Sequence, residues 1–176
     1  MYFLLNKITP IVGFHDAVKS WIGPLQKKQD FAIQKIAFEL KTSMTGDSTL
    51  IKISSLDQLD NSNNNLFLVH NHICKSISNG GDSLELMFNK ASEMFEGNAE
   101  TESDFFKKIK QLYGKATDAQ LKETYDFVGM EIYEITNKFP CLTRKNVPNG
   151  VSNAKYSINP AHISSFEFNG DIKELL

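Results

Sequence analysis

The chain has 176 residues, 41% of them hydrophobic, which is enough for one domain with a substantial core. Its formal net charge of −2 gives no global positive field, which argues against nucleic acid as a partner unless a local basic patch exists. No apolar run approaches the ~20 residues of a membrane helix, and interruptions at Lys7 and Pro10 argue against a signal peptide.

Cysteine and arginine content narrow the expectations further. Two cysteines, Cys74 and Cys141, are too few for a disulfide framework and fit a reducing compartment, so we expect a cytoplasmic protein. Arg144 is the sole arginine, which removes the usual means of bidentate guanine reading and leaves lysines for phosphate contacts. No internal repeat or long linker is visible, and we expect residues 1–176 to form one domain.

The hydrophobic pattern predicts the elements in chain order. Residues 2–21 have helical periodicity with an expected break at Pro10. Strand-like patterns mark residues 29–43, 49–55, 66–76, 125–135 and the late stretch AKYSI. Helical patterns mark the stretch SSLDQLD and residues 83–95, 102–113 and 117–124, whereas residues 61–65 and 79–81 are expected loops. Strands first, helices in the middle and strands again favour an α/β (α+β) sandwich around a mixed sheet.

The hairpin QDFAIQKIAFELKTS, residues 29–43, is apolar enough for a core yet carries charges. If the turn lies at its central Gln-Lys pair, the numbers of opposed residues sum to 69, so Asp30 faces Glu39. The Cβ atoms of such a pair lie ~5 Å apart. Strand alternation places Lys41 on the same face as Glu39, ~7 Å along the strand.

Two opposed carboxylates repel each other, and burial raises the pKa of one of them. A divalent cation removes both costs, and oxygen ligands on adjacent strands suit Mg²⁺. Such a metal would polarise a scissile phosphate and acidify a water, while Lys41 could position that water or stabilise the developing charge. A hairpin with a solvated polar edge gives the same alternation, so spacing alone leaves both readings open.

Four stretches in order resemble a family of PD-(D/E)XK-motif proteins found near bacterial restriction and phage-defence genes. They are WIGPLQKKQDF, AFELKTS, IKISSLDQL and FPCLTRKNVPNGVSNAKYSI, which lie between residues 21 and 158. The ELK triplet alone is weakly specific, and the ordered set is much more specific. An unrelated α+β domain would require all four matches to be coincidental.

The resemblance implies a restriction-endonuclease-like fold and a metal-dependent endonuclease that hydrolyses DNA phosphodiester bonds. Asp30 and Glu39 match the family's metal ligands, Lys41 its catalytic lysine, and Gln58 a glutamine that supports the site from the following helix. The implied cofactor is Mg²⁺, with Mn²⁺ as a substitute. The implied partners are DNA, subunits of a restriction or phage-defence system and a second copy of the chain, with no membrane.

Two features depart from the family pattern. The family usually has GE in an N-terminal helix, and that glutamate is a common extra metal ligand; here the first acid is Asp16. This predicts an N-terminally shortened member or a natural start further upstream. It also keeps open a second function, a non-catalytic subunit that retains the fold and binds DNA or a protein. Gln29, in place of a proline, precedes Asp30, which is a frequent variation.

Other charged and metal-binding residue types have weaker patterns. The lysines close to the hairpin and its following strand are the expected phosphate contacts: Lys27, Lys28, Lys35 and Lys52. The lysines at 107, 108 and 110 and the acids of residues 93–104 are expected on solvated helix faces. His70, His72 and Cys74 alternate along one expected strand, but His70 and Cys74 would lie ~13 Å apart, too far for one zinc ion. A strand leaving the core explains them, and His70 stays a candidate neighbour of the carboxylate site.

Overall fold

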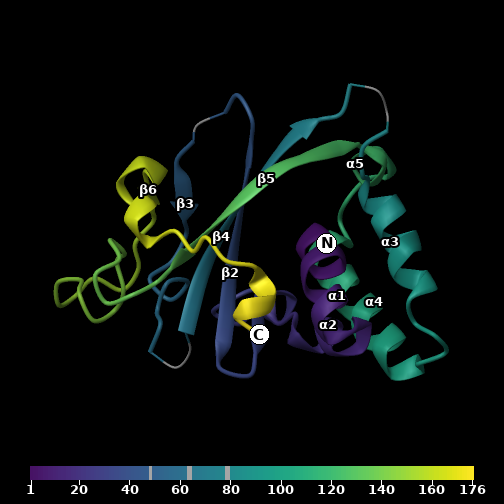
Figure 1. The fold of residues 1–176 in the computed structure, drawn as a ribbon, viewed down its shortest axis with the longest axis horizontal. Helices are drawn as coiled ribbons and strands as arrows, with labels where there is room; N and C mark the ends of the chain where they lie inside the picture. Colours follow the sequence, from purple (N-terminus) through teal and green to yellow (C-terminus); the bar gives the residue numbers. More distant parts are fainter. Residues whose placement is uncertain (48, 63–64, 78–79) are drawn as a thin grey trace.

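A mixed four-stranded sheet, with the strand order β1-β2-β4-β5, forms the middle layer of the computed structural model (Figure 1). The structure describes residues 1–47, 49–62, 65–77 and 80–176, so the loops expected at 61–65 and 79–81 lie partly outside the described residues. The strands are β1 (Phe31–Ile33), β2 (Ile36–Met44), β3 (Ile51–Ile53), β4 (Asn65–Lys75), β5 (Tyr125–Glu134) and β6 (Tyr156–Ile158). The predicted α/β (α+β) class with a mixed sheet is confirmed.

Helices cover one face of this sheet, and the small β3–β6 sheet covers the other (Figure 1). The longer helical segments are η1 (Leu4–Ile8), α1 (Thr9–Val12), α2 (Phe14–Ser20), α3 (Leu84–Glu93), α4 (Ala99–Tyr113) and α5 (Asp118–Lys122). Short 3₁₀ turns are η2 (Gly23–Leu25), η3 (Pro160–His162), η4 (Ser164–Phe166) and η5 (Ile172–Glu174). No helix in the described ranges has the length and apolar character needed to cross a membrane.

The hairpin register is the one that the sequence predicts. Phe31 pairs with Phe38 and Ile33 with Ile36 in an antiparallel ladder, which leaves a two-residue turn. Gln34 in that turn has a φ of 53°, a left-handed conformation uncommon for a residue with a side chain. Buried aromatic residues on the flanking strands therefore set the register, since the turn itself has unfavourable residues.

β4 is the central strand, parallel to β2 and antiparallel to β5. Residues 66–71 are all buried, as expected for a strand covered on both faces. Alternation divides its side chains between two cores: Phe67 packs with Phe38 on the helix side, and Leu68 packs with Tyr133 on the β3–β6 side. On the β3–β6 side, polar residues follow the apolar ones: Glu39 and Lys41 come after Ala37 on β2, and His70 comes after Leu68 on β4.

Pro10 does not break the N-terminal helix, and that prediction is wrong. The π-helical turn η1 runs directly into α1, where Pro10 occupies one of the first two positions. Pro10 therefore lies inside a continuous helical run, and the π-helical turn before it accommodates the missing N–H: the N–H and the hydroxyl of Thr9 both donate to the Leu4 carbonyl (2.9 Å from the hydroxyl). The break comes instead at Gly13, whose φ of 81° ends α1 before α2 begins.

β3 forms as predicted but pairs with β6 rather than joining the main sheet. The SSLDQLD stretch after it is a turn at residues 56–59 and not the predicted helix. Gln58 explains the difference, because its Oε1 accepts hydrogen bonds from the N–H and the hydroxyl of Ser54 (2.8 and 3.1 Å). These bonds close the turn without the helical backbone ladder.

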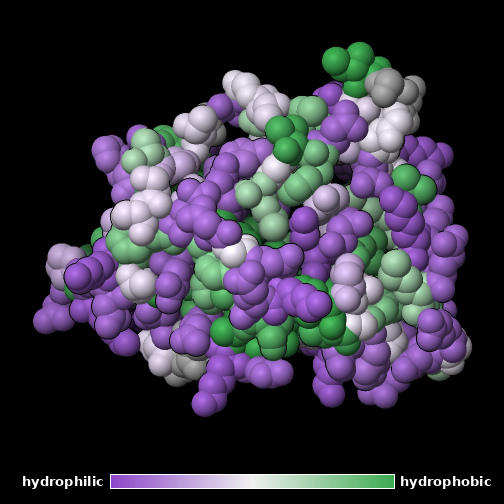
Figure 2. All heavy atoms as spheres, viewed as in Figure 1, coloured by the Kyte–Doolittle hydropathy of each residue, from purple (hydrophilic) through white to green (hydrophobic). Residues whose placement is uncertain are grey.

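Hydrophilic residues cover most of the face seen in the space-filling view (Figure 2). Hydrophobic residues are visible in that view beside the C-terminal end of the chain and over the upper part of β5. Lys108 is an exception to the predicted solvated face of α4, because it is only 1% exposed. Its ammonium donates to the Val18 carbonyl and to Asp104 Oδ2, both at 2.7 Å. The lysine therefore ties α4 to the end of α2 inside the helical layer.

Replacing Lys108 by Met should lower the free energy of unfolding by about 1–3 kcal/mol, because a charge-assisted bond to a buried carbonyl is lost. Lys107→Met, an exposed change on the same helix, should cost less than about 0.5 kcal/mol. Urea denaturation of both variants measures the difference. Equal losses in the two variants would show that the buried ammonium stabilises nothing.

Candidate active site

Asp30, Glu39 and Lys41 lie together where β1 begins beside β2. Glu39 is only 2% exposed, and the Lys41 ammonium contacts Glu39 Oε1 at 2.8 Å. The strand pairing ends at Phe31 and Phe38, and the Asp30 N–H donates to the Phe38 carbonyl (3.0 Å), so Asp30 lies just outside the ladder, close enough for its charge to act on Glu39. The Leu40 N–H donates to Asp30 Oδ2 (2.8 Å), which fixes this carboxylate against the free edge of β2.

The segment before the hairpin holds Asp30 in place. The N–H groups of Ile22 and Gly23 both donate to the Asp30 carbonyl (2.9 Å each). A Cβ on Gly23 would lie 2.5 Å from Asp30 Oδ1, so only glycine allows this close approach. Trp21 anchors the segment by stacking on Phe31 with ring centroids 6.3 Å apart. The WIG sequence thus places a carboxylate at the edge of the sheet.

Burial makes this pair of carboxylates electrostatically unfavourable. Loss of solvation, followed by the charge of Asp30, raises the pKa of Glu39 from its ordinary value of 4.5 to about 7, although Lys41 opposes the shift. Burial also raises the pKa of Asp30, against the effects of the Leu40 N–H, Lys41 and the amino terminus of Met1. These cationic groups therefore do not fully compensate the buried Glu39 and the half-buried Asp30. An oxygen-ligated divalent cation would do so, and the donor set fits Mg²⁺ or Mn²⁺.

A hollow of about 370 Å³ opens beside this cluster. Its polar lining includes Lys41, Ser43, Asp47 and Lys52, which come from β2, the turn after it and β3. A phosphate group could enter from solvent here and approach the Lys41 ammonium. The structure thus brings one of the four expected phosphate-contacting lysines, Lys52, next to the catalytic candidates.

The other three expected lysines lie in different surroundings. Lys28 pairs with Asp60 (3.1 Å), and Lys27 is exposed in the segment before the hairpin. Lys35 lies in the hairpin turn, four residues before Glu39, which is ~13 Å along the strand. That distance places Lys35 at the opposite end of β2 from Lys41.

Gln58 is half-buried and is engaged by Ser54, so the structure assigns it to the turn after β3. In the described part of the chain, the hydrogen bonds of its side chain run to Ser54 and not to either carboxylate. The neighbouring Asp57 bonds a residue far along the chain. Its Oδ1 and Oδ2 accept from Arg144 Nε (2.8 Å) and Nη2 (2.9 Å). Gln29 Nε2 also donates to the Asp57 carbonyl (3.4 Å). The turn at residues 56–59 therefore connects the segment before Asp30 to the late TRKN stretch.

The sequence does not predict two features of this region. The arginine–aspartate pair joins residues 87 positions apart, whereas the sequence pattern bears on the sole arginine only as a possible base reader. The second feature is a polar row across three strands: Lys41 pairs in register with His70, and His70 pairs with Glu131. The expected proximity of His70 to the site follows from this register. Glu131 gave no signal, since strand alternation does not reveal which strand pairs with which.

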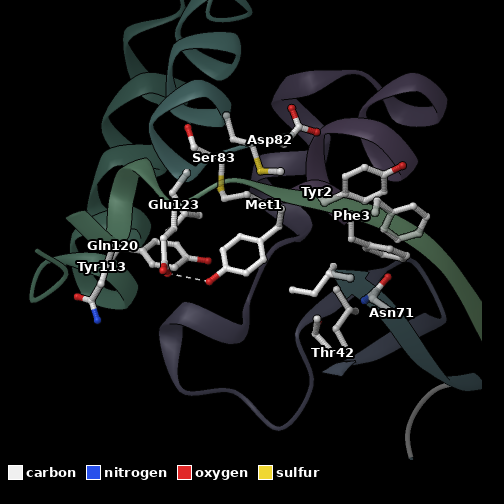
Figure 3. Close-up of a pocket in the computed structure, with 16 residues that line it drawn as sticks. Met1, Tyr2, Phe3, Thr42, Asn71, Asp82, Ser83, Tyr113, Gln120 and Glu123 are labelled. Atoms are coloured by element: carbon white, nitrogen blue, oxygen red, sulfur yellow. Dashed lines mark hydrogen bonds between the residues drawn. The ribbon is translucent and has the colours of Figure 1, made fainter. Parts of the chain in front are cut away.

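A separate cavity of about 280 Å³ lies on the helix-covered face of the sheet (Figure 3). Thr42 and Asn71 line it from the strands, while Tyr2 and Tyr113 line it from the helical layer. The charge of the candidate site acts on this cavity, because burial and then the charge of Asp30 raise the pKa of Tyr113. None of the predicted catalytic residues lines this cavity.

The comparisons with known proteins give one match. A family model described as "Putative PD-(D/E)XK family member, (DUF4420)" matches residues 1–160 of the chain. No curated protein and no solved structure matches. The matched range contains Asp30, Glu39, Lys41 and Gln58.

The raised pKa of Glu39 predicts a pH-dependent stability in the metal-free protein. The folded chain holds the extra proton between the ordinary pKa of 4.5 and the folded value of about 7. The free energy of unfolding should therefore fall as the pH rises through this window, by on the order of 1–3 kcal/mol. Glu39→Gln should remove this decline, whereas the exposed control Glu134→Gln should keep it. Urea denaturation in EDTA across pH 5–8 measures the slope, and identical slopes in both variants would contradict the burial of an ionisable Glu39.

Proposed function

The chain belongs to this PD-(D/E)XK family, and from that premise we propose that it is a metal-dependent nuclease that hydrolyses DNA phosphodiester bonds. Its setting would be a restriction or phage-defence system. The observation that carries the proposal is the convergence of Asp30, Glu39 and Lys41 on one strand pair. A buried and a half-buried carboxylate with a lysine at this spacing suit phosphoryl chemistry better than they suit a structural role, because the two carboxylates destabilise a metal-free fold.

Each side chain has a distinct part in this proposal. Asp30 and Glu39 would hold Mg²⁺, which would supply positive charge beside the scissile phosphate. The Lys41 ammonium, at 2.8 Å from Glu39, is close enough to orient the attacking water or to stabilise the charge that develops on the phosphate. The water oxygen would form a bond to phosphorus as the bond to the leaving sugar oxygen breaks; the water proton passes to solvent, and the leaving oxygen takes up a proton from solvent. Gln58 would act only indirectly, by closing the turn after β3 in which the Asp57 carbonyl accepts from Gln29, the residue before Asp30.

The hollow beside Lys41 supports a position for the DNA backbone. Lys41 and Lys52 both line it, and a backbone phosphate placed there would lie on the same sheet face as the carboxylates. Lys27 and Lys28 lie in the segment before Asp30, and from there they would contact phosphates further along the bound DNA strand. Lys35 lies at the far end of β2 and is the weakest member of the predicted set.

A second candidate function is a non-catalytic subunit that keeps the nuclease fold and binds DNA or a protein. The observation that favours it is the neutralisation of basic groups near the site. Arg144 is paired with Asp57 and Lys28 with Asp60, and each pairing reduces the positive charge available to attract a duplex. The formal net charge of −2 points the same way.

Plasmid cleavage tests the proposal directly. The wild-type chain should nick or linearise supercoiled DNA with Mg²⁺ or Mn²⁺ and should do nothing in EDTA. Asp30→Asn, Glu39→Gln and Lys41→Met should each lower the rate by at least ~100-fold, because each removes a group that stabilises developing charge. Lys107→Met removes the same charge as Lys41→Met at an exposed position of α4, outside the predicted set of DNA contacts, and it should cleave at close to the wild-type rate.

The outcomes separate the two candidates. Undiminished cleavage in the Asp30, Glu39 and Lys41 variants would show that the activity belongs to another site or to a contaminant. A wild-type chain that retains DNA in a gel-shift assay and cleaves none with either metal would favour the non-catalytic subunit.

A further inference from the structure

Two histidines and a glutamate converge on the face of the sheet that also carries Lys41. His70 and His72 alternate along β4, and Glu131 comes from the paired strand β5. His72 Nε2 lies 2.6 Å from Glu131 Oε2, and His70 Nδ1 lies 3.6 Å from the same oxygen. One ligand atom from each of the three residues falls within 4.8 Å of the other two.

His70 has one ring nitrogen paired and the other without a hydrogen bond. Its Nε2 lies 2.9 Å from Ser43 Oγ on β2. Its Nδ1 is buried without a hydrogen-bond partner, in a residue with 0% exposure, and it points toward Glu131. A metal-binding histidine has this arrangement, in which the second nitrogen is held by a hydrogen-bond partner and the first keeps a free lone pair. The hydroxyl of Ser43 therefore orients the ring for a ligand at Nδ1.

Local packing leaves room for a bound ion. The residue opposite His72 is Gly129, and no atom lies within 4 Å of the position that its Cβ would occupy. The rings of His70 and His72 have centroids only 4.2 Å apart, so both imidazoles face the same space. The Glu131 side chain is 38% exposed and can reorient. A tetrahedral zinc site with bonds of ~2.0–2.1 Å separates its ligand atoms by ~3.3 Å. The 3.6 Å pair is close to that value, and a small rotation of Glu131 brings the 2.6 Å pair to it.

We propose that His70 Nδ1, His72 Nε2 and a Glu131 carboxylate oxygen form a binding site for a divalent transition metal of the Zn²⁺ class. Two imidazoles and one carboxylate are ligands that Zn²⁺ accepts, whereas Mg²⁺ requires oxygen ligands. Three protein ligands leave a fourth position free for water or an anionic group. His72 and Glu131 are 25% and 38% exposed, so that position faces solvent.

This site is chemically distinct from the carboxylate pair of the proposed nuclease centre. Lys41 is the in-register neighbour of His70, but its ammonium is directed to Glu39 (2.8 Å). The carboxylate pair and the histidine site thus lie on adjacent strands, and the positive charge of Lys41 is associated with the carboxylate pair. Binding at the histidine site requires neither cleavage activity nor a metal at Asp30 and Glu39, so it extends beyond the proposed function.

Zinc titration against a chromophoric chelator tests the proposal on the full chain. The wild type should bind one equivalent of Zn²⁺ at this site, and an Asp30→Asn/Glu39→Gln double variant should keep that equivalent with unchanged affinity. Ser43→Ala should weaken binding by ~10–100-fold, since it removes the group that orients His70. His72→Ala and Glu131→Gln remove ligands at partly exposed positions and should each weaken binding by more than Ser43→Ala does.

Two controls test the ligand set. His162→Ala, at an exposed histidine, and Cys74→Ser, two residues from His72 on β4, should both leave the zinc affinity unchanged. Co²⁺ bound to the wild type should show visible absorption without a thiolate charge-transfer band. Failure of the wild type to bind Zn²⁺ would overturn the proposal. So would an affinity that survives both His72→Ala and Glu131→Gln, or one that disappears in Cys74→Ser. Circular dichroism of each variant confirms that it is folded.

Discussion

The register of one short hairpin brings the three candidate catalytic side chains together. Phe31 pairs with Phe38, the preceding Asp30 bonds the Phe38 carbonyl beside Glu39, and the Leu40 N–H fixes the Asp30 carboxylate. A shift of one residue would turn Glu39 and Lys41 to the helix-covered face and dismantle the cluster. The apolar residues of the hairpin thus hold the charged ones in place, which explains why charges occur in a segment that otherwise reads as core.

The two faces of the sheet have different roles as a result of strand alternation. The helix side is filled by aromatic residues such as Phe38, Phe67 and Phe105, which anchor the N-terminal helices and α4. The β3–β6 side is apolar only near its centre, around Leu68 and Tyr133. Beyond this centre its residues become polar, so that carboxylates, lysines and histidines meet on a firm support. A rigid sheet that carries polar groups at one end of one face is a suitable platform for metal-assisted chemistry.

Much of the fold could be predicted because hydrophobic period and local turn chemistry determine it. The hairpin register, the central strand β4 and the helices α3, α4 and α5 all follow from patterns within a dozen residues. The errors arose where a side chain replaced a backbone bond or a neighbour lay far along the chain. Gln58 closes a turn in place of a helix, and Lys108 reaches a carbonyl of α2 that lies 90 positions away.

The candidate site divides in the same way. Asp30, Glu39 and Lys41 could be brought together by counting residues, since they belong to one hairpin. The meeting of His70 and Glu131 could not, because it depends on the pairing of β4 with β5. The pairing of Arg144 with Asp57 likewise depends on how the late part of the chain folds back. Sequence patterns therefore identify side chains that meet within one hairpin, whereas only the order of strands in the sheet shows which side chains from other strands lie beside them.

The most direct test of the central claim is a crystal structure determined after soaking in Mn²⁺, with anomalous scattering used to locate the ion. The proposed nuclease centre predicts an anomalous peak coordinated by carboxylate oxygens of Asp30 and Glu39, with Lys41 moved from its contact with Glu39. A fully soaked crystal with no anomalous peak between these two carboxylates would contradict a metal-dependent site at the hairpin.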